Sequence, residues 1–505
     1  MSGVVFHLWS ANLALGIDIL RDASSPGAIF DSHEHYDRRC FPGTREQYIA
    51  DITNWVTESI DTPSSMYWMR GPAGVGKSAI AQTCAEKLKK TGHLGAAFFF
   101  TVKGHNSSLR LFTTIAYQLS TTLPDYRVVV DERISKDKTL VEKKISSQFE
   151  SLIVEPLQEL QKQGKVIRPK AVFIDGLDEC AGEDAQAEII KMIASSVRNG
   201  STPFRWAIFS RAESRIVSTF KQDIVASVTH SVELPISRDA DGEIEMYLRG
   251  EFKSILEHRD YVSWPADSDI QTLVDAADGL FAHPAAVLRH VAYPRDCQFR
   301  ERLQSVLDAV SQPGKEASTS PFSQLDALYV HILSQIPEGI LPSAQFFVCF
   351  AVLVLGYDID FLLYAAVISG ALRLSESTLR DICHHLHAVI AYDASFNPLS
   401  STDPRIDLTR SLFDQGQWFR PEFSFLHHLL GVHGSLRFYH KSFYDFLGDP
   451  ARSGPFCVTT PAIYCKLVDH WIQLHHHYAS SYTVGGSSTS FRPGICPSTY
   501  LLFQS

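Results

Sequence analysis

Short apolar runs alternate with amphipathic segments over the first half of the chain. The runs are rich in aromatic and β-branched residues, which favour strands, and the segments between them have the spacing of helices. The predicted strands are Met66–Met69, Ala96–Val102, Ala171–Asp175, Trp206–Ser210 and Val225–Leu234. The predicted helices between them are Ser78–Lys90, Leu109–Leu119, Ser146–Lys162 and Ala185–Val197. This alternation predicts a mostly parallel sheet with helices on both faces, and ligands at the carboxyl ends of its strands.

Helical patterns flank this region on both sides. Residues 44–60 predict a helix with Thr44 as its N-cap. Beyond about residue 240 the strand pattern fades and helices are predicted at 241–257, 267–277, 280–293, 296–310, 322–335 and 341–390. The composition of Gln312–Pro321 predicts a linker, and the Ser/Gly/Thr-rich stretch from 479 predicts a poorly ordered tail.

The composition is that of a globular protein. The chain has 505 residues, 45% of them hydrophobic and 20% charged, with a net charge of −10. This balance disfavours binding to nucleic acid through bulk positive charge. The most apolar stretch, Phe346–Leu355, is too short to cross a bilayer, and the N-terminus lacks the features of a secretory signal. We therefore expect a soluble cytoplasmic protein that binds neither membrane nor nucleic acid, with its nine cysteines reduced.

Residues 71–78 read G-P-A-G-V-G-K-S and match the phosphate-binding loop G-x-x-x-x-G-K-[ST] at every fixed position. The glycines let backbone N–H groups point at a phosphate, and the following helix adds the positive end of its dipole. Lys77 is expected to reach the β- and γ-phosphates, and the Ser78 hydroxyl to bind Mg²⁺. The candidate nucleotide-binding residues are Gly71, Pro72, Ala73, Gly74, Val75, Gly76, Lys77, Ser78 and Ala79. A glycine-rich turn that caps a helix by accident is the alternative.

Two further pieces would complete such a site. Residues 171–180 read A-V-F-I-D-G-L-D-E-C, a buried strand closed by Asp175, which is the candidate Mg²⁺ ligand. Asp178 and Glu179 follow as candidates to polarise the attacking water, unless they form a solvated turn or cap a helix. Arg211 follows the strand W-A-I-F-S and is a candidate sensor of the γ-phosphate; the alternative is an exposed loop arginine.

In this order and spacing, the three pieces resemble the NACHT family of signal-transduction NTPases (the STAND class), and more narrowly its fungal NLR-like group. Matching text runs from about residue 40 to 475 and comprises C-F-P-G-T-R (40–45), W-M-R-G-P-A-G-V-G-K-S-A-I-A-Q (68–82), F-I-D-G-L-D-E-C (173–180), F-S-R (209–211), D-G-L-F-A (278–282) and Y-H-K-S-F-Y-D-F-L (439–447). The resemblance implies an α/β P-loop NTPase domain, then an all-α helical domain, then a winged-helix domain. It also implies that His440 is the winged-helix histidine that contacts the ADP β-phosphate; from its own surroundings it is a core histidine.

The expected domains follow from these patterns and the resemblance. They are an N-terminal segment (1–43), a nucleotide-binding domain (44–237), a small helical domain (238–312), a linker (313–321), a winged-helix domain (322–450), the start of a further helical region (451–478) and a disordered tail (479–505).

The expected function is a switch that binds ATP and ADP with Mg²⁺. Slow hydrolysis, with Lys77, Asp178 and Glu179 as the catalytic group, would control domain rearrangement and self-oligomerisation. ATP is favoured over GTP because no guanine-specificity motif follows the P-loop. Two alternatives remain open: a non-catalytic, nucleotide-stabilised scaffold that binds a protein partner, and a P-loop kinase or motor ATPase.

Overall fold

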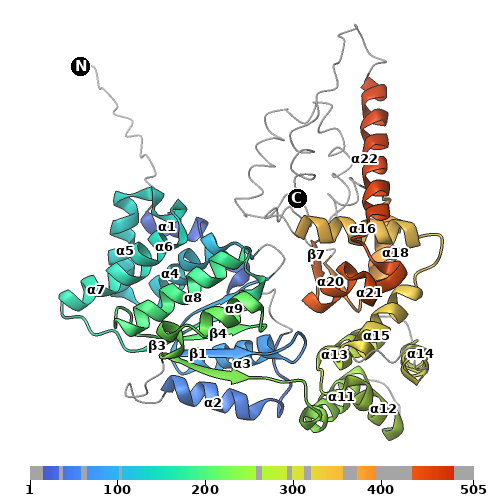
Figure 1. Cartoon of the computed structure of the whole chain (residues 1–505), viewed down its shortest axis with the longest axis horizontal. Coiled ribbons are helices and arrows are strands. Elements are labelled where there is room, and N and C mark those ends of the chain that lie inside the picture. Colours follow the sequence, from blue (N-terminus) through green and yellow to red (C-terminus); the bar gives the residue numbers. More distant parts are fainter. Residues whose placement is uncertain are drawn as a thin grey trace, which may run out of the picture. The chain divides into compact units, whose positions relative to one another are not determined.

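The structure is a computed structural model that describes part of the chain. The described residues are 15–32, 38–57, 65–101, 105–256, 264–292, 298–311, 320–355, 372, 374–393 and 435–482. The chain divides into two units, Met1–Ile236 and Ser237–Ser505, coloured from blue to green and from green to red in Figure 1. Most of the predicted linker, and the predicted tail beyond Tyr482, lie outside the described residues.

The first unit is built on a parallel sheet. Its strands are β1 (Met66–Arg70), β2 (Leu94–Phe99), β3 (Lys170–Asp175), β4 (Phe204–Ser210) and β5 (Thr229–Glu233). They lie in the order β2-β3-β4-β1-β5, and all four neighbouring pairs are parallel. The predicted parallel sheet is therefore confirmed, and β4 lies between β1 and β3.

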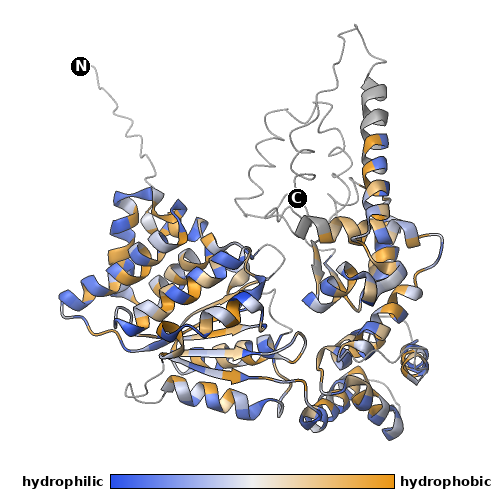
Figure 2. Cartoon of the chain, in the orientation of Figure 1, coloured by the Kyte–Doolittle hydropathy of each residue, from blue (hydrophilic) through white to orange (hydrophobic). Residues whose placement is uncertain are grey.

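Helices cover both faces of this sheet (Figure 1). Successive side chains of a strand point to opposite faces, which neighbouring residues of β1 illustrate. The Tyr67 ring packs on Trp55 of α2 (Glu46–Thr57), with centroids 5.3 Å apart, whereas the Trp68 ring stacks on Phe220 of α9 (Ser214–Phe220) at 4.0 Å. In Figure 2, hydrophobic residues follow the strands while the covering helices mix hydrophobic and hydrophilic residues, as burial on one side requires. The remaining helices of the unit are α1 (Gly16–Asp22), α3 (Lys77–Lys90), α4 (Leu111–Thr122), α5 (Pro124–Lys136), α6 (Ile145–Gln148), α7 (Glu155–Lys162), α8 (Glu183–Arg198) and α10 (Asp223–Ala226).

Some element boundaries differ from the prediction. The strand predicted from Val225 begins only at Thr229, because Val225 belongs to the short helix α10. Thr44 is not the N-cap of α2: the helix begins at Glu46, and the Thr44 hydroxyl donates to the Phe41 carbonyl at 2.7 Å.

The helix predicted over 146–162 contains a π-helical segment, Phe149–Val154, between α6 and α7. Pro156 follows it and has no N–H to donate to the carbonyl four residues earlier, at Leu152. The buried Tyr126 hydroxyl donates to that carbonyl.

The second unit is mainly helical in its described residues. Its helices are α11 (Asp241–Leu256), α12 (Asp267–Ala277), α13 (Ala282–Val291), α14 (Phe299–Ser311), α15 (Ser323–Ser334), α16 (Leu341–Leu355), α18 (Glu376–His385), α20 (Lys441–Gly448), α21 (Pro450–Ser453) and α22 (Pro461–Tyr482). No described helix of either unit combines the length and apolarity that crossing a bilayer requires.

A strand pair in the second unit was missed by the sequence analysis. β6 (Ile390–Asp393) pairs antiparallel with β7 (Ser435–Phe438), so Ile390 lies in a strand and not in the helix predicted over 341–390. Each strand has only four residues, too few for a period-two pattern to stand out. The winged-helix domain stays a prediction, because much of 322–450 lies outside the described residues.

Candidate nucleotide-binding site

The predicted site residues of the first unit meet at one edge of the sheet. The P-loop follows β1, the acidic turn follows β3, and Arg211 follows β4, and the carboxyl ends of parallel strands share an edge. Lys77 lies within electrostatic range of Asp178, Asp175, Glu179 and Arg211, because each of these charges shifts its pKa. The sheet order therefore brings together five charged residues that are spread over 135 positions from Lys77 to Arg211.

Glycines determine the shape of the P-loop. Gly74 and Gly76 have φ values of 80° and 101°, a region that residues with a Cβ rarely adopt. Gly71 lies against the end of β5: a Cβ there would be 2.2 Å from the Leu234 carbonyl oxygen. The loop leads into α3, whose N-cap is Gly76 and whose first turn contains Ser78 and Ala79. This strand–loop–helix arrangement is the one that the phosphate-binding motif requires.

Lys77 folds back over its own loop. Its Nζ donates to the carbonyl oxygens of Gly71 and Pro72, at 2.7 Å each. Burial lowers the pKa of Lys77 to about 8, opposed by the carboxylates of Asp178 and Asp175. The ammonium is thus held at the loop in an environment where an added anion would be favourable.

Asp175 and Ser78 lie in contact at the start of α3. Asp175 is 2% exposed, and burial raises its pKa to about 6, opposed by a hydrogen bond from the Ser78 side chain. A buried carboxylate paired with a hydroxyl is an oxygen donor set that suits Mg²⁺. These two residues fit the predicted metal, which would neutralise phosphate charge.

Asp178 is bound to Arg211. Its carboxylate accepts a hydrogen bond from the Arg211 backbone N–H at 3.0 Å and forms an ion pair with Nε at 3.3 Å. The Asp178 side chain is 4% exposed and that of Arg211 is 22% exposed. The alternatives of a solvated turn for Asp178 and an exposed loop arginine are therefore wrong. Glu179 is half-buried in the short 3₁₀ turn after Gly176.

Two arginines that sequence reasoning did not single out also lie here. Arg45 is 8% exposed, has φ 57°, and donates from Nη2 to the Val75 carbonyl of the P-loop at 3.0 Å. Arg38 lowers the pKa of Asp175 through its charge. The segment between them lies along α3, since the Cys40 N–H donates to the Thr83 hydroxyl at 3.0 Å. For Arg45 the only signal was the C-F-P-G-T-R text (40–45), and Arg38 lies outside that text.

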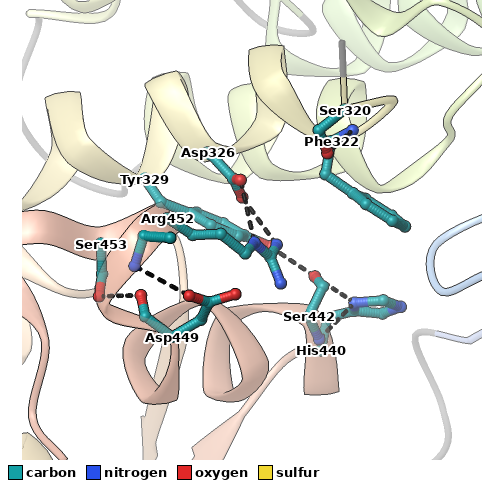
Figure 3. Close-up of polar contacts among 10 residues, drawn as sticks. Ser320, Phe322, Asp326, Tyr329, His440, Ser442, Asp449, Arg452 and Ser453 are labelled. Carbon is teal, nitrogen blue, oxygen red and sulfur yellow. Dashed lines mark hydrogen bonds and ion pairs between the residues drawn. The ribbon is translucent and has the colours of Figure 1, made fainter. Parts of the chain in front are cut away.

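His440 belongs to the second unit. It is the N-cap of α20, where its Nδ1 accepts from the Ser442 backbone N–H at 3.1 Å (Figure 3). Its ring is partly exposed. The structure thus gathers the predicted residues from Gly71 to Arg211 in one unit and gives His440 a defined role as a helix cap in the other.

Comparisons with known proteins agree with a P-loop fold. Residues 43–211, about a third of the chain, match the family described as Nephrocystin 3, N-terminal. This range begins just before α2 and ends at Arg211, so it contains the P-loop, the acidic turn and the arginine. No curated protein matches the chain.

Similar solved structures are distant. Cdc6p from Pyrobaculum aerophilum is 12% identical with a TM-score of 0.36, over 76% of this chain and 97% of that one. Drosophila ORC bound to poly(dA/dT) DNA and Cdc6 is 11% identical with a TM-score of 0.24, over 96% of this chain and 75% of that one. Likenesses this weak carry no argument. The strand order, the P-loop and the family match assign the α/β P-loop NTPase fold to the first unit.

Proposed function

We propose that this chain is a nucleotide-operated switch that binds ATP and ADP with Mg²⁺ at the carboxyl edge of the sheet. One observation carries the proposal. Lys77, the Ser78–Asp175 pair and Arg211 come from three different strand ends, and Lys77 lies within electrostatic range of both Asp175 and Arg211. These residues match the charges of a Mg²⁺–triphosphate: the ammonium and the guanidinium are cations for the phosphates, and the hydroxyl and carboxylate oxygens are ligands for the metal.

Each residue has a distinct task in this proposal. The P-loop N–H groups and Lys77 bind the phosphates, and Ser78 and Asp175 hold Mg²⁺, which would supply charge neutralisation when bound. Arg211 contacts the γ-phosphate. Glu179 positions the attacking water, whereas Asp178, with its carboxylate bound by Arg211, orients that guanidinium.

The switch itself rests on the resemblance to the NACHT family. In this part of the proposal, His440 couples the nucleotide state to the second unit, ADP stabilises an inactive form, and ATP permits rearrangement and self-association. The family match over 43–211 supports the nucleotide-binding half alone.

The first test is the identity of the nucleotide that the protein carries. The full chain is purified, denatured, and the released nucleotide is identified by chromatography. We expect adenine nucleotide in the parent and in Lys90→Ala, which changes an exposed lysine at the end of α3. We expect none in Lys77→Ala. Equal ADP affinity for Lys77→Ala and the parent would refute the proposed site.

The second candidate function is a non-catalytic scaffold. The contact between Asp178 and Arg211 favours it, because this contact occupies one of the two carboxylates that could activate water. Turnover separates the two functions. A switch with hydrolysis requires Glu179→Gln to lower ATP turnover by about 10²-fold or more, with ADP affinity retained. Glu183→Gln, an exposed acid in the first turn of α8, is the matched control. If the parent hydrolyses ATP no faster than the uncatalysed reaction, the hydrolytic switch is refuted and the non-catalytic scaffold is supported.

A further inference from the structure

Arg45 contacts the P-loop from a segment that precedes β1 in the chain. Its Nη2 donates to the Val75 carbonyl oxygen at 3.0 Å, and a Cβ added to Gly76 would lie 4.0 Å from its Nε. Arg45 is 8% exposed and Val75 is fully buried, so the bond is shielded from water. A hydrogen bond from a charged donor is stronger than one between neutral groups. The guanidinium therefore fixes the direction of one carbonyl of the loop.

The direction of the Val75 carbonyl determines that of the next N–H. Both groups belong to the peptide unit between Val75 and Gly76, which is trans. In a trans peptide the C=O and the N–H point in opposite directions. Because the carbonyl points at Arg45, the Gly76 N–H points away from the guanidinium. Backbone N–H groups of a P-loop are the donors that surround the phosphates, so this direction matters for binding.

Arg45 is itself held by helix α2. Its carbonyl accepts the Ile49 N–H at 3.1 Å, in the first turn of that helix. Helix α2 packs beside α3 (Figure 1). The φ of Arg45 is 57°, a conformation that residues with a Cβ keep only where the surrounding contacts fix them. The guanidinium thus extends to the P-loop from a rigid element.

The loop has two cations on its carbonyls, and they differ in what nucleotide would do to them. Lys77 donates to the carbonyls of Gly71 and Pro72, and these bonds compete with its proposed task at the phosphates. The bond from Arg45 does not compete, because the Val75 carbonyl and the Gly76 N–H lie on opposite sides of the peptide unit. Arg45 can therefore hold the loop both with and without nucleotide.

We propose that Arg45 is a positioning residue of the nucleotide site: by binding the Val75 carbonyl, it keeps the Gly76 N–H directed at a phosphate oxygen of ADP. The inference rests on the proposed function in one respect, that this loop binds phosphate. Gly76 has a φ of 101° and, without a Cβ, could adopt other conformations. A donor that is already oriented needs no reordering when the anion arrives, so the bond contributes to affinity without a contact between the guanidinium and nucleotide.

Two substitutions in the full chain separate the donor from the packing of its stem. Arg45→Met and Arg45→Lys both keep a straight aliphatic stem, but only lysine ends in a donor. We expect Arg45→Met to bind ADP with Mg²⁺ about ten-fold more weakly, and Arg45→Lys to stay within about three-fold of the parent. Arg39→Met is the matched control, because Arg39 is exposed and pairs with Glu86 of α3 at 2.9 Å. Its ADP affinity should equal that of the parent.

The peptide unit itself can be observed by labelling valine carbonyls with ¹³C and glycine nitrogens with ¹⁵N. The sequence has two Val–Gly pairs, Val75–Gly76 and Val484–Gly485, and the signal that disappears in Val484→Ala is that of Gly485. Without nucleotide, the Val75 carbonyl shift should change in Arg45→Met and stay near the parent value in Arg45→Lys. Addition of ADP should move the Gly76 amide to lower field in the parent, and less so in Arg45→Met. An unchanged Val75 carbonyl in Arg45→Met would overturn the inference.

The affinities separate this inference from the proposed function. If Arg45→Met and Arg45→Lys weaken ADP binding equally, the stem matters and not the donor, and the positioning role is wrong. If Lys77→Ala abolishes binding but Arg45→Met binds like the parent, the site stands and the role of Arg45 is refuted. If Lys77→Ala binds like the parent, the proposed site itself is wrong.

Unfolding in denaturant, without nucleotide, tests whether the contact is merely structural. We expect Arg45→Met and Arg45→Lys to remain folded, with similar free energies of unfolding. An unfolded Arg45→Met beside a folded Arg45→Lys would make the bond a requirement of the fold and overturn the positioning role.

Discussion

The buried ammonium of Lys77 predicts that nucleotide binding takes up a proton in mildly alkaline solution. Burial lowers its pKa to about 8 without nucleotide, from an ordinary value of 10.5. A phosphate beside the ammonium favours the charged form and raises the pKa back towards that value. Nucleotide therefore selects the protonated lysine. Above pH 8, binding is therefore coupled to protonation of Lys77.

The magnitude follows from linkage. With a pKa of about 8 before binding and a value above 10 after it, ADP binding takes up about half a proton at pH 8 and about nine-tenths at pH 9. The dissociation constant is unaffected by this group below about pH 7 and rises about ten-fold per unit of pH between the two pKa values. The nearby Asp175, with a pKa of about 6, titrates below this range and does not contribute to the effect.

Titration calorimetry measures this uptake directly. ADP and Mg²⁺ are titrated into the full chain at pH 7, 8 and 9, in two buffers of different ionisation enthalpy, and the dependence of the observed enthalpy on the buffer gives the protons taken up. Lys77→Arg keeps a permanent positive charge and is expected to show no uptake. Lys90→Ala, at the exposed end of the same helix, should match the parent. Tight ADP binding at pH 9 without proton uptake would refute the assignment of Lys77 to the phosphates.

Three other predictions concern the P-loop, the metal pair and the second unit. Gly71→Ala places a Cβ 2.2 Å from the Leu234 carbonyl oxygen. It should abolish ADP binding, measured by calorimetry, and lower the free energy of unfolding by about 1–3 kcal/mol. The control Gly242→Ala adds a Cβ in open space on α11 and should change neither quantity. The pKa of about 6 for Asp175 predicts that Mg²⁺ affinity in the ADP complex falls about ten-fold per unit of pH below 6, measured by metal titration; an unchanged affinity at pH 5 would contradict this. Burial lowers the pKa of His290 to about 3 in the folded protein. Between pH 6.5 and 3 the unfolded chain therefore binds more protons at this residue than the folded protein does. The free energy of unfolding falls as the pH falls through that range. His283, with a pKa lowered to about 4, adds a loss of the same sign, so denaturant unfolding should show a loss between pH 7 and pH 5 that is about 2 kcal/mol smaller in His290→Gln than in the parent.

The sequence predicted the structure best where a feature depends on residues that are adjacent in the chain. The strands β1 to β4 were predicted close to their observed positions, because buried parallel strands are continuous apolar runs that differ from the amphipathic helices between them. The fifth strand, β5, is mostly exposed and was predicted four residues too early. The P-loop was predicted residue by residue, since its glycines and Lys77 are adjacent in the chain. Asp175 could be placed at the sheet edge because it ends a strand.

Features that depend on contacts between distant segments could not be predicted. Nothing in the text around Asp178 indicates that its carboxylate binds Arg211, 33 residues later and on another strand end. Arg45 precedes the helix α2. It is buried against the P-loop because α2 packs beside α3, a contact between segments that the local sequence does not indicate. The antiparallel pair of β6 and β7 joins segments more than 40 residues apart, each only four residues long.

The position of β4 explains why Arg211 and the acidic turn act together in the proposed switch. Because β4 lies between β1 and β3, Arg211 at its end shares this edge of the sheet with the P-loop and with Asp175. The bond from the Arg211 N–H to Asp178 joins the ends of β4 and β3 across this edge, and Glu179 is the next residue in the same short turn. An arginine that moves when the γ-phosphate leaves would therefore move Asp178 with it, and through the turn also Glu179.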